Sequence, residues 1–134
     1  MPSSVDLICV PPNEVEKIWE YAGGMIRAAI ERTDLSDFAD IEKDVLAGDQ
    51  LLWLAISDHI EAAATTHLSR GVCTLTACSG HHRERWLPLF ARIEKYAKDE
   101  GCSTMRIYGR KGWERVLDGY HVEHVVLEKD LGRH

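Results

Sequence analysis

Three side chains on predicted strands have the chemistry of a general base: Glu61, His67 and Tyr108. A carboxylate, an imidazole or a tyrosine oxygen can accept a proton when it lies within hydrogen-bonding reach of a substrate. Apolar residues alternate along 60–69, so Glu61 and His67 fall together on the polar side of that strand. The competing interpretation is structural, with a solvated strand face and a half-buried tyrosine ring.

The cysteines and histidines offer weaker chemistry. Cys9, Cys73, Cys78 and Cys102 include no Cys-x-x-Cys pair and are interpreted as reduced, packed thiols. Cys78 precedes a loop and could act as a nucleophile, although a small packed thiol is the simpler interpretation. The neighbours His81 and His82 would point to different sides, and His121 and His124 to opposite faces of a strand. We therefore expect no zinc site.

The charge balance is acidic, with 16 lysines and arginines against 22 aspartates and glutamates, for a net charge of −6. General nucleic-acid binding, which requires neutralisation of phosphates, is not expected. The basic residues of the later half gather in one stretch: Arg83, Arg85, Arg106, Arg110, Lys111 and Arg115. They could form a local anion site or contact a partner, or they could simply pair with the many carboxylates.

Length and composition indicate one domain over residues 1–134. With 134 residues, of which 45% are hydrophobic, the chain can form a hydrophobic core without disulfide bonds or structural metal ions. No apolar run approaches the roughly 18 residues that a membrane span needs, and the first residues show no export signal. We expect a cytoplasmic protein without membrane association.

Periodicity and turn residues predict the elements that position these side chains. Strands are predicted at 5–10, 51–56, 60–69, 72–78, 104–108 and 121–129, and helices at 13–32, 36–47, 84–100 and 113–117. Asn13 with Glu16 forms a capping-box pattern, Gly48 is a C-cap, and Pro88 belongs in a first helical turn. The order β-α-α-β-β-β-α-β-α-β predicts an α+β or mixed α/β fold around one twisted sheet. The expected core includes Trp19, Trp53, Phe90, Ile93 and Ile107.

This order resembles the GNAT superfamily of acetyl-CoA-dependent N-acetyltransferases over nearly the whole chain. The segments that carry the resemblance are Leu75–Cys78, Ala97–Gly101, Met105–Tyr108 and Gly109–Tyr120. The last segment, with its Gly-Arg-x-Gly-Trp element, is most similar to the GNAT-like proteins of tailed phages and prophages. The resemblance implies a GNAT-like fold, and it implies acetyl-CoA as the donor if the protein is active.

The same resemblance exposes departures at the donor-binding loop. The family's Q/R-x-x-G-x-G/A loop, whose glycines let backbone N–H groups approach the pyrophosphate, maps onto His81–Trp86. Glu84 and Trp86 occupy the two small positions, adding a charge and a bulky ring. Any coenzyme A contact would then fall on His81, His82, Arg83 and Arg85. The family's general-acid tyrosine maps onto Arg115.

Two functions follow from these observations. The first is a GNAT-like protein of phage type that binds a partner, self-associates or serves a virion without acetyl transfer, with no cofactor expected. The second is an N-acetyltransferase of unknown amine substrate that holds acetyl-CoA through Arg83 and Arg85. In the first, Trp113, Val116 and Leu117 bury against the sheet, and Arg110 and Lys111 contact a partner or anion.

Overall fold

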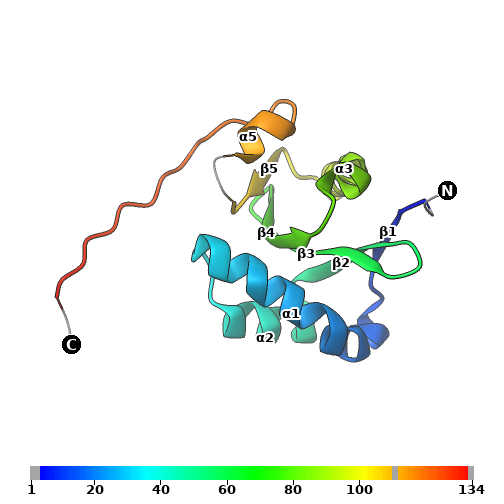
Figure 1. Ribbon diagram of the computed structural model, residues 1–134. Helices are drawn as coiled ribbons and strands as arrows, with labels where there is room; N and C mark the ends of the chain where they lie inside the picture. Colours follow the sequence, from blue (N-terminus) through cyan, green and yellow to red (C-terminus); the bar gives the residue numbers. More distant parts are fainter. Residues whose placement is uncertain (1–3, 110–111, 133–134) are drawn as a thin grey trace.

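A single mixed β-sheet organises the protein, as a computed structural model of residues 4–109 and 112–132 shows (Figure 1). Its strands are β1 (Asp6–Cys9), β2 (Leu51–Ile56), β3 (Ile60–Ser69), β4 (Val72–Gly80) and β5 (Thr104–Ile107), in that spatial order. The first four run antiparallel to their neighbours, whereas β5 lies parallel to β4. The parallel pair is possible because a helical crossover separates these two strands.

Helices cover both faces of the sheet. On one face lie α1 (Val15–Thr33) and α2 (Phe38–Ala47), and on the other lie α4 (Phe90–Asp99) and α5 (Trp113–Val116). Successive side chains of β2 point to opposite faces, so Leu52 and Leu54 pack under α1 while Trp53 packs under α4. A continuous apolar run such as that of β2 is typical of a strand covered on both faces.

The predicted polar face of β3 is wrong, because β3 is also covered on both sides. Its residues from Glu61 to Thr66 are all buried, including Glu61 at 6% exposure and Thr65 at 0%. Thr65 is accommodated by hydrogen bonding through its hydroxyl to Thr76, at 2.7 Å. The alternation of apolar and polar residues along β3 therefore does not indicate which side chains are exposed to solvent. A polar side chain can be buried when it has a hydrogen-bonding partner.

Helix boundaries follow the glycine signals better than the capping-box pattern. Gly48, with φ of 85°, ends α2 as expected, and Gly119 likewise adopts a positive φ, of 81°, after α5. Asn13 instead lies inside a 3-10 helix, η1 (Pro12–Glu14), and caps nothing through its side chain. The side-chain cap lies on α2, where Asp37 accepts from the N–H groups of Ala39 and Asp40.

The predicted helix over 84–100 is divided into three pieces. A short α3 (Arg83–Trp86) leads into a 3-10 turn, η2 (Leu87–Leu89), and then into α4. Pro88 lies in η2 and not in the first turn of one long helix. A proline has no N–H for the helical ladder and crowds the preceding turn, so the axis changes there.

The C-terminal part departs most from expectation. Residues 120–132, which we call the terminal segment, form no strand in the described structure and extend away from the sheet (Figure 1). As a consequence β5 is an edge strand, and Ile107, expected in the core, is only half-buried. Trp113 and Val116 are likewise half-buried, whereas Leu117 is buried at 8% exposure.

Candidate functional site

The β4 and β5 strands pair along only part of their length and then separate. Their register runs from Val72–Thr104 to Leu75–Ile107, and the N–H of Tyr108 makes a further bond to the carbonyl of Leu75 at 3.0 Å. Beyond that bond β4 continues to Gly80, whereas the backbone that follows β5 turns away at Gly109. The part of β4 after Leu75 pairs with β3 but not with β5, and this leaves an opening at this end of the sheet.

A cavity of about 60 Å³ lies at this opening. Its lining includes Arg32 and Thr33 from the end of α1, Cys78 from β4, and Tyr108 and Trp113 from the far side. The guanidinium of Arg32 donates from Nη2 to the hydroxyl of Ser79 at 2.8 Å, which fixes this cation beside β4. Sequence reasoning found Tyr108 but missed Arg32, since only the packing of α1 across β4 places that residue here.

Gly109 shapes one wall of the cavity. A Cβ on this glycine would lie 2.7 Å from Cδ1 of Trp113, so the indole ring packs directly on the backbone. The same ring also lies 6.3 Å from that of Trp86 and 6.5 Å from that of Phe90, between centroids. The absence of a side chain at Gly109 therefore lets the Trp113 ring pack on the backbone and form the wall of the cavity beside Tyr108.

Cys78 does not have the properties of a nucleophile in this setting. Burial raises the pKa of its thiol to about 12. A nucleophilic cysteine needs a lowered pKa and access, because the thiolate is the reactive form. The interpretation of Cys78 as a packed thiol therefore accounts for its surroundings.

The His81–Trp86 loop follows directly from β4 and is held against β3. A Cβ on Gly80 would lie 2.6 Å from both the Cβ of Ala62 and the carbonyl oxygen of Glu61, so only glycine permits this approach. The N–H of His81 donates to that same carbonyl at 3.3 Å. His82 adopts a left-handed conformation, with φ of 53°, and turns the chain into α3.

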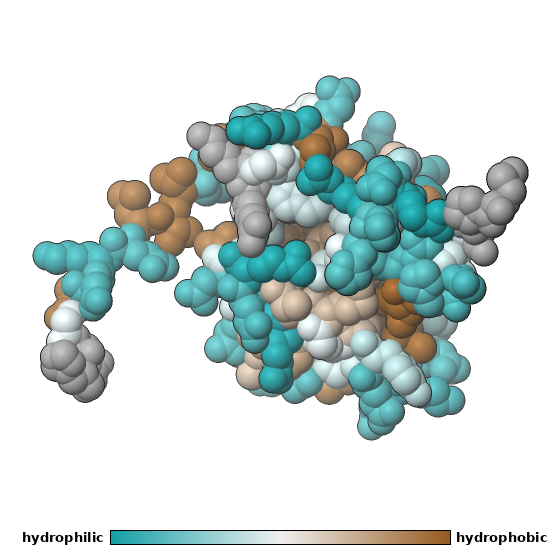
Figure 2. Space-filling model, viewed as in Figure 1, coloured by the Kyte–Doolittle hydropathy of each residue, from teal (hydrophilic) through white to brown (hydrophobic). Residues whose placement is uncertain are grey.

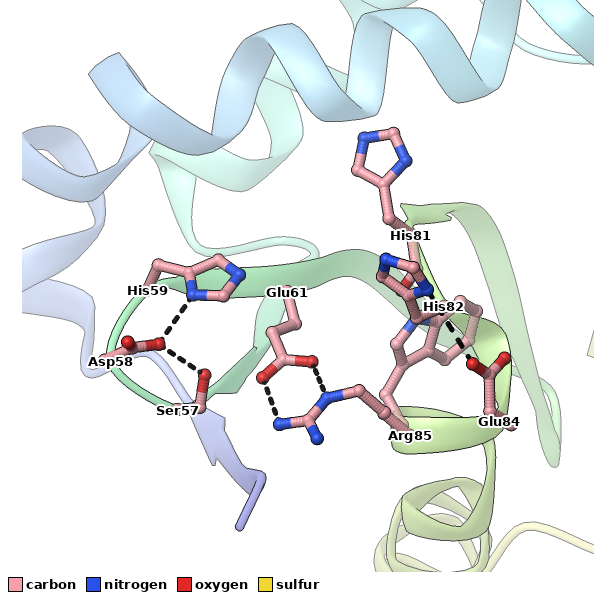
Figure 3. A network of polar contacts seen from close by, with 9 residues as sticks. Ser57, Asp58, His59, Glu61, His81, His82, Glu84 and Arg85 are labelled. Carbon is pink, nitrogen blue, oxygen red and sulfur yellow. Dashed lines mark hydrogen bonds and ion pairs between the residues drawn. The ribbon is translucent and has the colours of Figure 1, made fainter. Parts of the chain in front are cut away.

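A partly buried ion pair joins this loop to β3 (Figure 3). Arg85 donates from Nε to Oε1 of Glu61 at 2.5 Å and from Nη2 to Oε2 at 2.8 Å. The Glu61 side chain is 4% exposed and that of Arg85 27%. The hydrogen bonds from Arg85, with a further one from Ser57, hold the pKa of Glu61 at about 2.

Three features of this loop act against binding of the pyrophosphate of coenzyme A. A phosphate cradle is built from free backbone N–H groups, and two of those in the loop, on His81 and Arg85, donate to the carbonyls of Glu61 and His82. Trp86 is 7% exposed and donates from its indole nitrogen to the His81 carbonyl at 2.9 Å, and its ring packs against Ala55 and Ala62 of the sheet. Glu84 adds a carboxylate whose side chain is 76% exposed.

The residues predicted for the site are distributed over three places. Glu61 and Arg85 meet, whereas His67 lies six residues further along β3, about 20 Å away at about 3.3 Å per residue. Tyr108 lies at the cavity between β4 and β5. The side chains of His81, His82 and Arg83 are exposed on the loop, and His81 points away from the ion pair (Figure 3).

Two further features concern ligands and membranes. Across residues 4–109 and 112–132, no group of three histidine, cysteine or carboxylate side chains is placed to hold a metal ion. None of the helices in that part of the chain combines the length and apolar character required to cross a bilayer. Arg110 and Lys111, predicted to contact a partner or anion, lie outside the described residues.

Comparison with known structures identifies the fold. The aminoglycoside N-acetyltransferase AAC(6')-Iy, in complex with CoA, superposes with a TM-score of 0.66 at 16% identity, covering 98% of this chain and 97% of that one. A GNAT family acetyltransferase from Staphylococcus aureus gives 0.61 at 15% identity, with 96% and 99% covered. The ribosomal-protein-alanine N-acetyltransferase of Brucella melitensis gives 0.63 at 13%, with 94% and 100% covered. No protein-family model and no curated protein sequence matches the chain.

The protein therefore has the mixed α/β fold of the GNAT acetyltransferases, as the order of its elements predicted. Identities of 13–16% establish the shared fold and leave the activity to be argued from the site itself.

Proposed function

We propose that this chain is a GNAT-fold binding protein that does not transfer acetyl groups. The observation that carries the proposal is that side chains and carbonyl groups of the protein itself contact the His81–Trp86 loop. The N–H groups of His81 and Arg85, the indole ring of Trp86 and the guanidinium of Arg85 are each bonded within the protein, to the carbonyls of Glu61, His82 and His81 and to the carboxylate of Glu61. Opening the loop would require breaking the Glu61–Arg85 ion pair and exposing the indole ring of Trp86, which is 7% exposed, and that exposure would lose apolar burial.

The particular role that we propose is in a phage particle or prophage region. It rests on the similarity of the Gly109–Tyr120 segment to phage GNAT-like proteins, and on the basic pair Arg110 and Lys111 within it. The double substitution of this pair by alanine should change the stability by no more than roughly 0.5 kcal/mol per site. The same variant should bind the partner more weakly.

Calorimetry with acetyl-CoA on the purified protein tests the main proposal. We expect no saturable binding below about 1 mM, which corresponds to about −4 kcal/mol. Glu84→Gly is the matched variant, because it removes the exposed carboxylate without touching the ion pair or Trp86. It should leave binding undetectable. A dissociation constant in the low micromolar range for the unaltered protein would contradict the proposal.

An acetyl-CoA-dependent N-acetyltransferase remains the second candidate, for one specific reason. Tyr108 and Arg32 both line the cavity where β4 and β5 separate, and the Arg32 guanidinium is bonded to Ser79. A tyrosine and a cation at a cavity could orient a polar substrate and support proton transfer. Acetylation of an amine panel that depends on Tyr108, tested with Tyr108→Phe, would favour this candidate over a binding role.

A further inference from the structure

A row of three polar side chains crosses the sheet near the start of β4. The register pairs His67 of β3 with Thr74 of β4, and Thr74 with Arg106 of β5. The neighbouring residues Leu75 and Ile107 pack on the α4 side of the sheet, so the alternation of the strands directs this row to the other face. We call these three residues the polar row, and its members lie about 5 Å apart from strand to strand.

The polar row has hydrogen-bonding capacity that the protein does not use. Within residues 4–109 and 112–132, no hydrogen bond or ion pair involves the side chains of His67, Thr74 or Arg106. Thr74 is 8% exposed, and His67 and Arg106 are half-buried. Arg106 thus differs from Arg85, because no carboxylate of the described chain forms an ion pair with it. A partly buried cation of this kind is stabilised by an anionic partner.

The polar groups beside the row are, by contrast, already bonded to one another. Thr65, two residues before His67, bonds to Thr76 at 2.7 Å, and Thr76 donates to Gln50 at 2.6 Å. Gln50 in turn donates to Asp44 at 3.1 Å. Polar groups at such buried positions normally have partners within the protein. The polar row therefore differs from its surroundings, because its donors are open to a ligand.

The lengths of the side chains in the row suit one tetrahedral anion. Thr74 is short and lies in the middle, whereas His67 and Arg106 are longer and flank it. All three can therefore donate to one group that lies over the Thr74 hydroxyl. The three terminal oxygens of a phosphoryl group match these three donors, and a guanidinium binds such oxygens in a fork geometry. A carboxylate offers only two oxygens and would leave one donor unused.

We propose that the polar row binds the phosphoryl group of a small molecule, either inorganic phosphate or a phosphate monoester. A small ligand is favoured over a nucleic acid, because the chain has a net charge of −6 and would repel a polyanion. Figure 2 shows many hydrophilic side chains over the globular body and a group of hydrophobic ones on the terminal segment, which agrees with a polar ligand for the body. Thr74 precedes Gly80 by six residues, about 20 Å along β4, so the inference does not depend on coenzyme A binding at the His81–Trp86 loop.

An NMR titration of the full chain at constant ionic strength tests the proposal. Inorganic phosphate and O-phosphoserine are the probes, and acetate and serine are their controls. At least one probe should shift the backbone amides of His67, Thr74 and Arg106 saturably, with half-saturation at or below about 1 mM. Acetate and serine should leave these amides unchanged. Stronger binding of O-phosphoserine would identify a monoester as the ligand, and stronger binding of phosphate would identify the inorganic ion.

Two arginine substitutions supply the matched comparison. Arg106→Gln removes the cation of the polar row and should weaken binding at least about tenfold. Arg70→Gln removes an equal charge at the exposed turn between β3 and β4, and it should change the affinity by less than about twofold, since salt screens exposed charges. Thr74→Val keeps the size of the side chain without the hydroxyl, so it should also weaken binding. The dispersed amide spectrum of each variant verifies that it folds.

Four results would overturn the proposal. Saturable shifts could be absent at the three amides, or acetate could produce equal shifts. Equal losses of affinity for Arg106→Gln and Arg70→Gln would show attraction by general charge and not by the polar row. An oligonucleotide that binds these amides more tightly than O-phosphoserine would replace the small ligand with a nucleic acid. Each result is independent of the calorimetry with acetyl-CoA, which concerns the loop at the other end of β4.

Discussion

Arg85 donates hydrogen bonds to both carboxylate oxygens of Glu61, which lies 24 residues earlier in the sequence, with donor–acceptor distances of 2.5 and 2.8 Å. The pair ties the loop after β4 to the middle sheet strand β3, and it does so in a place where the Glu61 side chain is only 4% exposed. A charged group buried to this degree is tolerated only when it is paired and hydrogen-bonded. The pair therefore serves to hold the loop closed.

The first prediction concerns acid stability. The pKa of Glu61 is about 2, below its ordinary value of 4.5, so the folded state favours the ionised form. The resulting stabilisation is complete above about pH 4.5 and is lost as the pH falls toward 2. Glu61→Gln removes this titration, so its melting temperature should fall less steeply than that of the unaltered protein over this window. Superimposable profiles would show that the carboxylate is not stabilised by Arg85.

The second prediction compares two arginines of the same loop. Arg85→Ala leaves the buried carboxylate of Glu61 without its bidentate partner, and it should lower the melting temperature strongly. Arg83→Ala is the control, because Arg83 is exposed. Its effect should be within roughly 0.5 kcal/mol of the unaltered stability. Equal losses in thermal melts of the two variants would mean that the ion pair does not anchor the loop.

The third prediction uses two glycines. Gly80→Ala would place a methyl group 2.6 Å from the β3 backbone, and the strain should cost about 1–3 kcal/mol. Gly24→Ala is the counterpart, because it lies exposed inside α1 with no atom within 4 Å of the added carbon. It should stabilise by about 0.5–1 kcal/mol. Urea unfolding of both variants gives the comparison, and a neutral Gly80→Ala would be inconsistent with the close approach.

The fourth prediction ranks two tryptophans. Trp53 is 7% exposed and bonds through its indole nitrogen to Thr66 at 2.9 Å, so Trp53→Ala should cost about 3–5 kcal/mol. Trp113 is half-buried, and Trp113→Ala should cost less than that range. The sequence alone predicted that Trp113 would bury against the sheet, which would place it in the same range as Trp53. Chemical denaturation decides the order, and a larger loss for Trp113 would restore the sequence-based assignment.

The fifth prediction concerns helix capping. Asp37→Ala removes an acceptor for the N–H groups of Ala39 and Asp40 at 2.8 and 3.3 Å, and it should cost about 1 kcal/mol. Asn13→Ala should cost much less, because Asn13 makes no side-chain cap to η1 or α1. Thermal melts of this pair test the structure against the capping-box pattern. A dominant effect of Asn13 would favour the pattern.

Local signals predicted most of the elements correctly. The continuous apolar run of β2, the positive-φ positions at Gly48 and Gly119, and the helical spacing of α1 all depend on neighbours in sequence. These signals hold because backbone conformation and side-chain period are properties of short segments. From their order, the GNAT-like arrangement could be predicted before any contact was known.

The candidate site was less accessible to the same reasoning. Glu61, His67 and Tyr108 were grouped by chemical type, yet the structure places Glu61 with Arg85 and separates it from the other two. Arg32 reaches the cavity only because α1 crosses β4, and no local pattern marks that crossing. A functional site joins distant segments, so its membership depends on packing and register.

The terminal segment shows most clearly what could not be predicted from the sequence. Its sequence determined a strand-like character, through the run Val125-Val126-Leu127, just as the sequence determined the strands, the helices and the unusual loop at His81–Trp86. Only the tertiary structure decided which of these segments found a partner: β3 was buried on both faces, Arg85 was taken by Glu61, and residues 120–132 were left outside the sheet. The physical reason is that periodicity specifies what a segment can pair with, whereas pairing itself requires an open edge or an opposite charge within reach.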